Sequence, residues 1–250
     1  MLRTLISLFV LTFFATTALA FDIEAMSDED RAIFRAEIRD YLLENPEVLM
    51  EAIAVLEERQ AAEAAHMDTA LIDVNRDAIF DDGFSWVGGN PDGDIVMVEF
   101  LDYRCGFCKR AFPAVEELIA SDGNVKLIIK EFPILGEQSV LASQYAIATK
   151  IVGGDDAYKT VHDTLMMHQG NVSEGFLART SRDLGLDHAK VVETMASEEV
   201  SNIIRTNRAL AQTLQIQGTP SFIMGEQFVR GFVELDQMRA IVADIRAGRG

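Results

Sequence analysis

The stretch "DYRCGFCKRAF" (102–112) contains both cysteines of the 250-residue chain, Cys105 and Cys108. It directly follows "IVMVEFL" (95–101), an apolar run rich in β-branched residues that is typical of a buried strand. From Cys108 onward, apolar residues recur at helical spacing as far as residue 120. The sequence therefore predicts that Cys105 lies where a buried strand ends and a helix begins.

Two thiols this close together allow three kinds of site. A structural disulfide between them would close a very short loop and remove little conformational entropy from the unfolded chain. A zinc site needs four ligands, and every histidine of the chain is distant from the cysteines in sequence. The histidines are His66, His162, His168 and His188. Cu(I) accepts two thiolates, so a copper-binding site stays open as an alternative.

A redox-active pair needs only the residues that are present. At a helix N-terminus, the unpaired backbone N–H groups and the helix dipole favour a thiolate and lower the pKa of the thiol. Cys105 is then the attacking thiol, and Cys108, one turn further inward, resolves the mixed disulfide. We therefore expect thiol–disulfide exchange with no cofactor and no metal ligand.

The rest of the chain predicts an α/β fold. A second strand is expected over "VKLIIKE" (125–131), and a helical region runs from residue 139 to about 215. The stretch "GTPSFIMGEQFVRGF" (218–232) predicts two strands around a turn at Gly225-Glu226. A last helix is expected over 235–247.

The motifs "VEFLDYRCGFCK", "IIKEFPILG", "HDTLMMHQG" and "GTPSF" follow one another along the chain. Together they resemble the DsbA-like family of bacterial periplasmic thiol–disulfide oxidoreductases, over roughly residues 85–247. The resemblance implies that residues 95–250 form a thioredoxin fold, with a helical domain at about 139–215 inserted between its second and third strands. It also implies that Pro220, after Thr219, is a cis-proline that faces the cysteines.

Two charged residues lie in the apolar strands. Glu99 precedes the cysteine motif, and Lys130 lies in the next strand. Buried charges persist when they are paired or functional. The resemblance implies that Glu99 lies under the active site, where it assists proton transfer to and from the resolving thiol, with Lys130 as its partner. The alternative is that both side chains reach solvent. Asp102 and Arg104 are expected to be solvated residues at the rim of the site.

The residues between the cysteines, Gly106 and Phe107, bear on the direction of the reaction. They differ from the Pro-His pair of the family's strongest oxidants. Without a histidine beside Cys105, the thiolate lacks one stabilising donor. We therefore expect a weaker oxidant that acts as an isomerase or reductase. The alternative is a monomeric dithiol oxidase.

The chain opens with "MLRTLISLFVLTFFATTALA" (1–20), which has the layout of a cleaved secretory signal peptide. The alternative, an uncleaved membrane anchor, is disfavoured because the apolar stretch is short for a membrane span. We expect export to the periplasm, with cysteine-containing exported proteins as substrates and a membrane protein as redox partner. The formal charge of −18 argues against nucleic acid as a partner.

The sequence predicts a helical segment over residues 21–80. A loop-rich linker at 81–94 joins this segment to the thioredoxin-like part of the chain. Apolar residues from Leu49 to Val74 follow a heptad pattern that is interrupted by Gln60 and Glu63. The stretch "YLLENPEVLMEAIAVLEERQ" resembles the N-terminal segment of the ScsC (suppressor of copper sensitivity) branch. In that branch the segment can oligomerise the catalytic domains, and the assembled form can isomerise disulfides. We therefore predict a homo-oligomer. The alternative is a helix folded back on the main domain.

Overall fold

The computed structural model describes residues 26–248. The predicted signal peptide (1–20) lies outside the described residues. The chain divides into two compact units between Gln60 and Ala61. The first unit contains helix α1 (Asp28–Glu44) and the first half of helix α2 (Glu47–Val74). The side chain of Ser27 caps α1 by accepting a hydrogen bond from the backbone N–H of Asp30.

The first unit carries exposed apolar side chains on both of its helices. None of the residues of α1 is buried. Exposed large apolar residues of this unit include Ile33, Ile38, Tyr41, Leu43, Leu49, Met50, Ile53, Val55 and Leu56. Exposed apolar side chains that gather on one segment often mark a protein interaction site.

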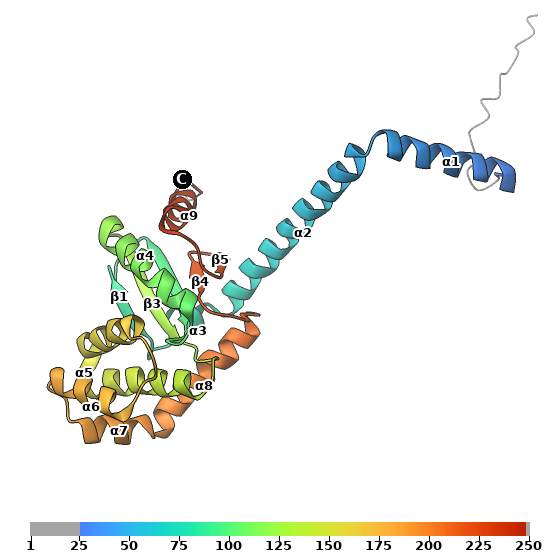
Figure 1. Ribbon diagram of the computed structural model, residues 1–250. Coiled ribbons are helices and arrows are strands. Elements are labelled where there is room, and N and C mark those ends of the chain that lie inside the picture. The colour runs from blue at the N-terminus through green and yellow to red at the C-terminus, as the bar shows by residue number, and fades with distance from the viewer. Residues whose placement is uncertain (1–25, 249–250) are drawn as a thin grey trace, which may run out of the picture. The chain divides into compact units, whose positions relative to one another are not determined.

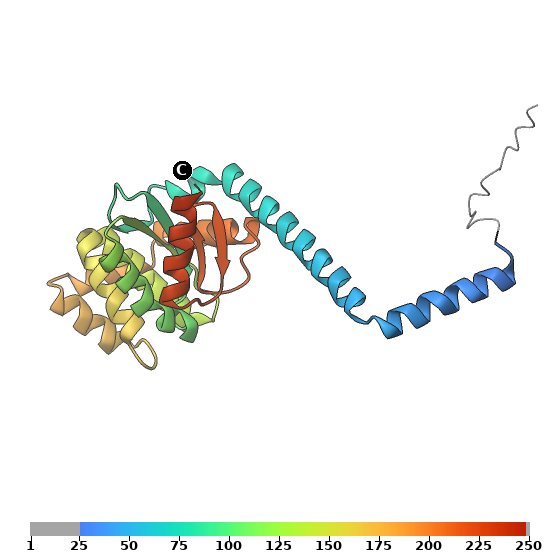
Figure 2. The ribbon, with the colours of Figure 1, turned by 90° about the horizontal axis from the view of Figure 1, so that it is seen from above.

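The second unit is built on a five-stranded mixed sheet in the order β1-β3-β2-β4-β5. The strands are β1 (Trp86–Gly89), β2 (Ile95–Leu101), β3 (Val125–Glu131), β4 (Ser221–Met224) and β5 (Gln227–Arg230). Strands β2 and β3 pair in parallel, and helix α4 (Gly106–Asp122) connects them. All other pairs of neighbouring strands are antiparallel. In Figure 2, α4 lies beside the last helix, α9 (Leu235–Ala247), in front of the sheet. This is the predicted thioredoxin fold.

Four helices lie between β3 and β4, where the sequence predicted a helical insertion. They are α5 (Glu137–Met167), α6 (Glu174–Asp183), α7 (His188–Met195) and α8 (Glu198–Thr213). Figure 1 shows α5, α6 and α7 gathered beside one end of the sheet. The insertion begins after a short loop that follows β3, and β3 lies beside β2, the strand that leads into the cysteine motif.

Strand β1 lies within the stretch that the sequence predicted to be a linker. Because glycine is uncommon in strands, the sequence did not predict a strand here. The structure shows why the glycines are needed. Gly89 has a φ of +68°, and a Cβ atom there would lie 2.3 Å from the carbonyl oxygen of Val125. Trp86, at the start of the strand, is buried, and its indole N–H donates to the carbonyl of Asp155 at 3.1 Å.

The sheet separates two apolar clusters. Along β2, Met97 and Leu101 belong to the cluster under α4 and α5, while Val98 and Phe100 point into the opposite cluster. That second cluster is covered by α8, by the end of α2 and by the short helix α3 (Arg76–Phe80).

The end of α2 and α3 are integral to the second unit. Ile72 of α2 and Ile79 of α3 are fully buried against the sheet. Burying one such side chain stabilises a fold by about 1.5–3 kcal/mol. The last part of the predicted association segment (21–80) therefore packs in the core of the second unit.

Candidate active site

Cys105 lies at the N-terminus of α4, as the sequence predicted. It is the N-cap residue, with extended backbone angles (φ −75°, ψ 116°), and its N–H donates to the carbonyl of Asp102 at 3.0 Å. Cys108 lies in the first turn of the helix. Cys105 is 7% exposed and Cys108 is fully buried, and both are free thiols.

The surroundings of Cys105 favour its thiolate. The pKa of Cys105 is lowered to about 5, chiefly by a hydrogen bond from the Cys108 thiol, with further donors in the Thr219 side chain and the backbone N–H groups of Cys108 and Phe107. Partial burial opposes this shift. The Thr219 carbonyl oxygen, which accepts from Sγ of Cys105, also favours the thiol form. The donors to the sulfur prevail, so Cys105 is the more acidic thiol of the pair.

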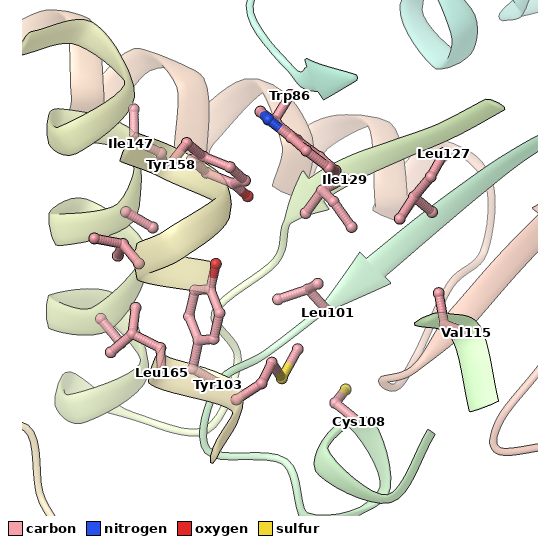
Figure 3. Packing of buried hydrophobic residues seen from close by; sticks show 14 of the residues in the cluster. Trp86, Leu101, Tyr103, Cys108, Val115, Leu127, Ile129, Ile147, Tyr158 and Leu165 are labelled. Atoms are coloured by element: carbon pink, nitrogen blue, oxygen red, sulfur yellow. The ribbon is translucent and has the colours of Figure 1, made fainter. Parts of the chain in front are cut away.

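The surroundings of Cys108 favour its thiol. Burial raises the pKa of Cys108 most, and the neighbouring Cys105 and the charge of Glu99 raise it further. Figure 3 shows Cys108 within the buried apolar cluster that includes Leu101 and Val115. Cys105 is therefore the more accessible of the two thiols.

The Thr219–Pro220 peptide bond is cis, as the resemblance implied. Sγ of Cys105 donates to the carbonyl oxygen of Thr219 at 3.1 Å, so this loop lies directly against the attacking thiol. Between the cysteines, Gly106 is exposed and the aromatic ring of Phe107 is 59% exposed. The attacking thiol therefore lies against a backbone carbonyl, and an exposed aromatic ring follows it in the motif.

Glu99 is buried, but Lys130 is not its partner. In the parallel register, Glu99 lies opposite Ile129, and Lys130 lies opposite Phe100. Because successive side chains of a strand point to opposite faces, the two charges lie on different sides of the sheet. Lys130 instead donates to Asp82 at 2.5 Å and to the carbonyl of Ala78 at 2.8 Å, so its role is structural.

Within the described part of the chain, Oε1 of Glu99 is buried without a hydrogen-bond partner. Burial raises the pKa of Glu99 to about 8, and the charges of Glu116 and Cys105 contribute. The carboxyl group is therefore mostly protonated at neutral pH. It lies on the same face of the sheet as the cysteines, as the resemblance implied.

Asp102 is not the solvated rim residue that the sequence predicted. It is fully buried, and its carboxylate accepts hydrogen bonds from the backbone N–H groups of Arg104 at 2.7 Å, Ile134 at 2.8 Å and Leu135 at 3.0 Å. Asp102 therefore fixes the loop after β3 to the loop that carries the cysteines. Arg104 is half-buried, and its guanidinium contacts the carbonyl of Gly170.

A buried polar cluster beneath the site was not predicted. The carboxylate of Glu131 accepts hydrogen bonds from Tyr103 at 2.8 Å, Tyr158 at 2.6 Å and Ser143 at 2.7 Å. Tyr103 also contacts Nδ1 of His162 at 3.1 Å. Burial raises the pKa of Glu131 to about 7 and lowers that of His162 to about 3. Figure 3 shows Tyr103 and Tyr158 between the sheet and α5, so this cluster joins the inserted helices to the cysteine-bearing loop. In the sequence, only the acidic residue at the end of the apolar stretch 125–131 pointed to this polar cluster.

Two features are absent from residues 26–248. No three His, Cys, Asp or Glu side chains of this range are grouped so that they could hold a metal ion. None of the helices in this range is long and apolar enough to cross a membrane.

Comparison with known proteins identifies the family. Residues 96–243 match the DsbA-like thioredoxin domain. The chain belongs to the DsbA-like thioredoxin family. Its members are thiol–disulfide oxidoreductases, and the cysteine pair, its place on α4 and the cis-proline loop fit that chemistry. Residues 30–63 of this DsbA-like protein match a second family, the N-terminal domain of the copper resistance protein ScsC.

Solved structures support both assignments. A thioredoxin-like oxidoreductase from Silicibacter pomeroyi is 40% identical, with a TM-score of 0.64 over 69% of this chain and 98% of that one. A Proteus mirabilis ScsC variant is 28% identical, with a TM-score of 0.66 over 90% of this chain and 98% of that one. A periplasmic thioredoxin-like protein from Salmonella enterica is 29% identical, with a TM-score of 0.62 over 68% and 95%.

Curated relatives include much longer proteins. The Na(+)/H(+) antiporter NhaA 1 of Salinispora arenicola is 27% identical over 162 residues, which cover 65% of this chain and 25% of that protein. The chain therefore spans about a quarter of the length of such relatives.

Proposed function

We propose that this DsbA-like protein exchanges disulfides with the cysteines of exported proteins through Cys105 and Cys108. The observation that carries the proposal is the asymmetry of the pair. The pKa of Cys105 is lowered to about 5, while that of Cys108 is raised. One thiol is therefore ionised at neutral pH, and the other stays protonated in the interior until a mixed disulfide forms.

Each step of the proposed reaction forms one S–S bond and breaks another. The Cys105 thiolate attacks one sulfur of a client disulfide, an S–S bond forms, and the other client sulfur leaves as a thiolate. Reduction is completed when Cys108 loses its proton and attacks Cys105, which releases the second client thiolate and oxidises the pair. Isomerisation is completed instead when another client thiolate attacks the mixed disulfide, because this returns Cys105 as a thiolate with no net transfer of electrons.

Glu99 is the candidate for moving the proton of Cys108. Its pKa of about 8 lies near a neutral working pH, so the carboxyl group both donates and accepts a proton without a large energetic penalty. Its charge acts on both cysteines. Lys130 has no part in this step because it lies on the other face of the sheet.

We propose isomerase or reductase action in a homo-oligomer as the cellular role. The exposed apolar residues of α1 and the first half of α2 support association through the described part of the first unit, residues 26–60. The match of residues 30–63 to the ScsC N-terminal domain agrees with this. Several sites that face one client raise the effective concentration of thiolates around it, which favours rearrangement over simple oxidation.

The periplasm is the compartment that suits this chemistry. Disulfides form and persist there, and the opening sequence predicts export. We propose exported proteins with cysteines as substrates and a membrane protein as the source or acceptor of electrons.

The proposal is tested with a scrambled-disulfide protein and with a simple dithiol as substrates. Cys105→Ser is expected to abolish exchange with both substrates, and Cys108→Ser is expected to accumulate mixed disulfides with the protein substrate. A monomeric protein that oxidises dithiols but refolds no scrambled substrate would support the oxidase alternative. Loss of exchange after a Cu(I) chelator is added would favour the copper alternative.

A further inference from the structure

Tyr103 connects the cysteine-bearing loop to the interior of the protein. It lies two residues before Cys105 and is only 1% exposed. Its hydroxyl donates to Oε1 of Glu131 at 2.8 Å, and Figure 3 shows its ring reaching from the loop toward Tyr158 of α5. The preceding residue, Asp102, binds the loop after β3 instead. The short turn that ends in Cys105 is therefore anchored on two sides.

The carboxylate of Glu131 accepts hydrogen bonds from two parts of the fold. Oε1 accepts from Tyr103 of the loop and, at 2.6 Å, from Tyr158 of α5. Oε2 accepts from Ser143 of α5 at 2.7 Å. The backbone carbonyl of Glu131 accepts from the side chain of Asn207 on α8 at 3.1 Å. Because hydrogen bonds to a carboxylate are stronger than those between neutral groups, Glu131 holds Tyr103 firmly to the inserted helices.

The directions of these hydrogen bonds follow from the number of protons. Tyr103 has one hydroxyl proton, which it donates to Glu131. Nδ1 of His162 lies 3.1 Å from the same hydroxyl and therefore donates to it. Burial keeps this imidazole neutral by lowering its pKa to about 3, so its single N–H is on Nδ1. The hydroxyl of Tyr103 is thus held by one acceptor and one donor.

The polar cluster also contacts helix α4. The ring of His162 lies edge-on to Phe112 of α4, with centroids 5.6 Å apart, and edge-on to Tyr103 at 5.7 Å. Phe112 follows Cys108 by about one turn of the helix. The loop before Cys105 and the helix after it therefore pack against the same imidazole, which fixes their relative positions.

The position of the turn decides which groups the Cys105 sulfur meets. The donors that favour its thiolate are the Cys108 thiol and backbone N–H groups of the first turn of α4. A hydrogen bond weakens steeply when its geometry departs from the optimum. Cys105 is the N-cap residue, and its own N–H binds the carbonyl of Asp102 in the loop. The loop therefore sets where the sulfur lies relative to these donors.

We propose that Tyr103, held by Glu131, is a positioning residue for Cys105, because it fixes the turn of residues 102–105 so that the sulfur faces the donors of α4. The inference rests on the proposed function and adds two residues that act on the nucleophile through the backbone. Stabilising the thiolate stabilises the reduced pair. The cluster therefore makes the protein a stronger oxidant than the cysteine motif would be without it.

The experiment measures the equilibrium between the cysteine pair and glutathione in the full mature protein. It is done at pH 8, where Glu131, with a pKa raised to about 7, is mostly ionised. Tyr103→Phe keeps the ring and removes the hydroxyl. We expect it to shift the equilibrium about threefold toward the disulfide, the size expected for about one weakened hydrogen bond.

Tyr158→Phe is the matched control. It removes a donor from the same oxygen of Glu131, but from α5 and not from the cysteine-bearing loop. It should lower the midpoint of thermal unfolding about as much as Tyr103→Phe does and leave the glutathione equilibrium unchanged. An equal shift in both variants, a shift toward the dithiol or no shift with Tyr103→Phe would make the cluster merely structural and overturn the inference.

Glu131→Gln separates position from charge. The glutamine carbonyl accepts from both tyrosines, and its amide donates to Ser143, whose hydroxyl also accepts. This variant should therefore keep the equilibrium of the original protein. A shift like that of Tyr103→Phe would mean that the charge of Glu131 acts on the thiolate, which also overturns the inference. If the original protein exchanged no disulfide with glutathione, the proposed function itself would be contradicted.

Discussion

Sγ of Cys105 lies 3.1 Å from the carbonyl oxygen of Thr219, although 114 residues separate them in the chain. The four inserted helices lie within that stretch of chain. The fold brings the loop before β4 back against the start of α4. This contact places the cis-proline loop directly against the thiol that we propose as the nucleophile.

Glu99 and Glu131 are expected to make the stability of the protein depend on pH. Their pKa values are raised to about 8 and about 7, so the folded state holds protons that the unfolded state releases above about pH 4.5. The stabilisation is complete below that pH and is lost as the pH rises through 7 and 8. Glu99→Gln should therefore flatten the fall of the unfolding free energy between pH 5 and 9, measured with urea. The same slope in both proteins would contradict the burial of a protonated Glu99.

Lys130 and Asp82 are expected to be a structural pair. Lys130 is fully buried beneath the sheet, and Lys130→Met would leave Asp82 unpaired in the interior. Breaking such a pair costs about 3–5 kcal/mol. Lys130→Met with Asp82→Asn should recover much of that loss, and Lys130→Met should not alter the reactivity of Cys105.

The control for this prediction is Arg205→Met. It breaks an exposed pair with Glu198 on α8, so it should cost less than about 1 kcal/mol. If Lys130→Met changed the pH dependence of Cys105 alkylation, Lys130 would have a role in the active site after all.

The start of the catalytic unit is expected to lie near Ala61. A protein that begins at Ala61 retains Ile72, Ile79 and Asp82, and it should fold cooperatively and keep exchange with dithiothreitol. A protein that begins at Phe84 loses all three residues, which leaves that face of the sheet covered by α8 without α2 and α3, and leaves Lys130 without Asp82. It should be unfolded by circular dichroism. A stable, active protein from Phe84 would show that α3 and the end of α2 are dispensable.

The first half of α2 is expected to hold the oligomer together. Ile53→Asp with Leu56→Asp should dissociate it, because the apolar surface that we propose to be buried between chains cannot bury unpaired charges. Sedimentation should show monomers, and isomerisation of a scrambled substrate should fall several-fold while dithiol exchange persists. Glu57→Gln, a neutral change on the same helix, is the control. An original protein that sediments as a monomer would refute the association.

The cysteine site could be predicted from local sequence, whereas the pairing of Glu99 and Lys130 could not. The prediction for Cys105 needed only three local features: the preceding strand, the start of a helix and a second thiol close by. The partner of a strand charge depends on the register between two strands, and a slip of one residue changes the face. Here Glu99 lies opposite Ile129, which sends Lys130 to the other side.

Asp102 and β1 show two further limits of sequence analysis. An acid after a strand suggests a solvated residue, but the N–H groups that bind Asp102 come partly from a loop more than thirty residues later. The glycines of β1 suggest a loop, but they are needed where the Trp86 ring lies over Gly88 and where Gly89 approaches the backbone of Val125. Contacts from distant parts of the chain decide both cases.

The central claim is that Cys105 is an ionised nucleophile at neutral pH and that Cys108 is a buried, protonated thiol. The direct measurement is the alkylation rate of each cysteine in the reduced protein against pH, with the sites distinguished by mass spectrometry of peptides. The account predicts that Cys105 reacts with an apparent pKa of about 5 and that Cys108 stays unmodified below pH 9. Equal modification of both cysteines, with a common pKa near ~8.5 as in a free thiol, would contradict it.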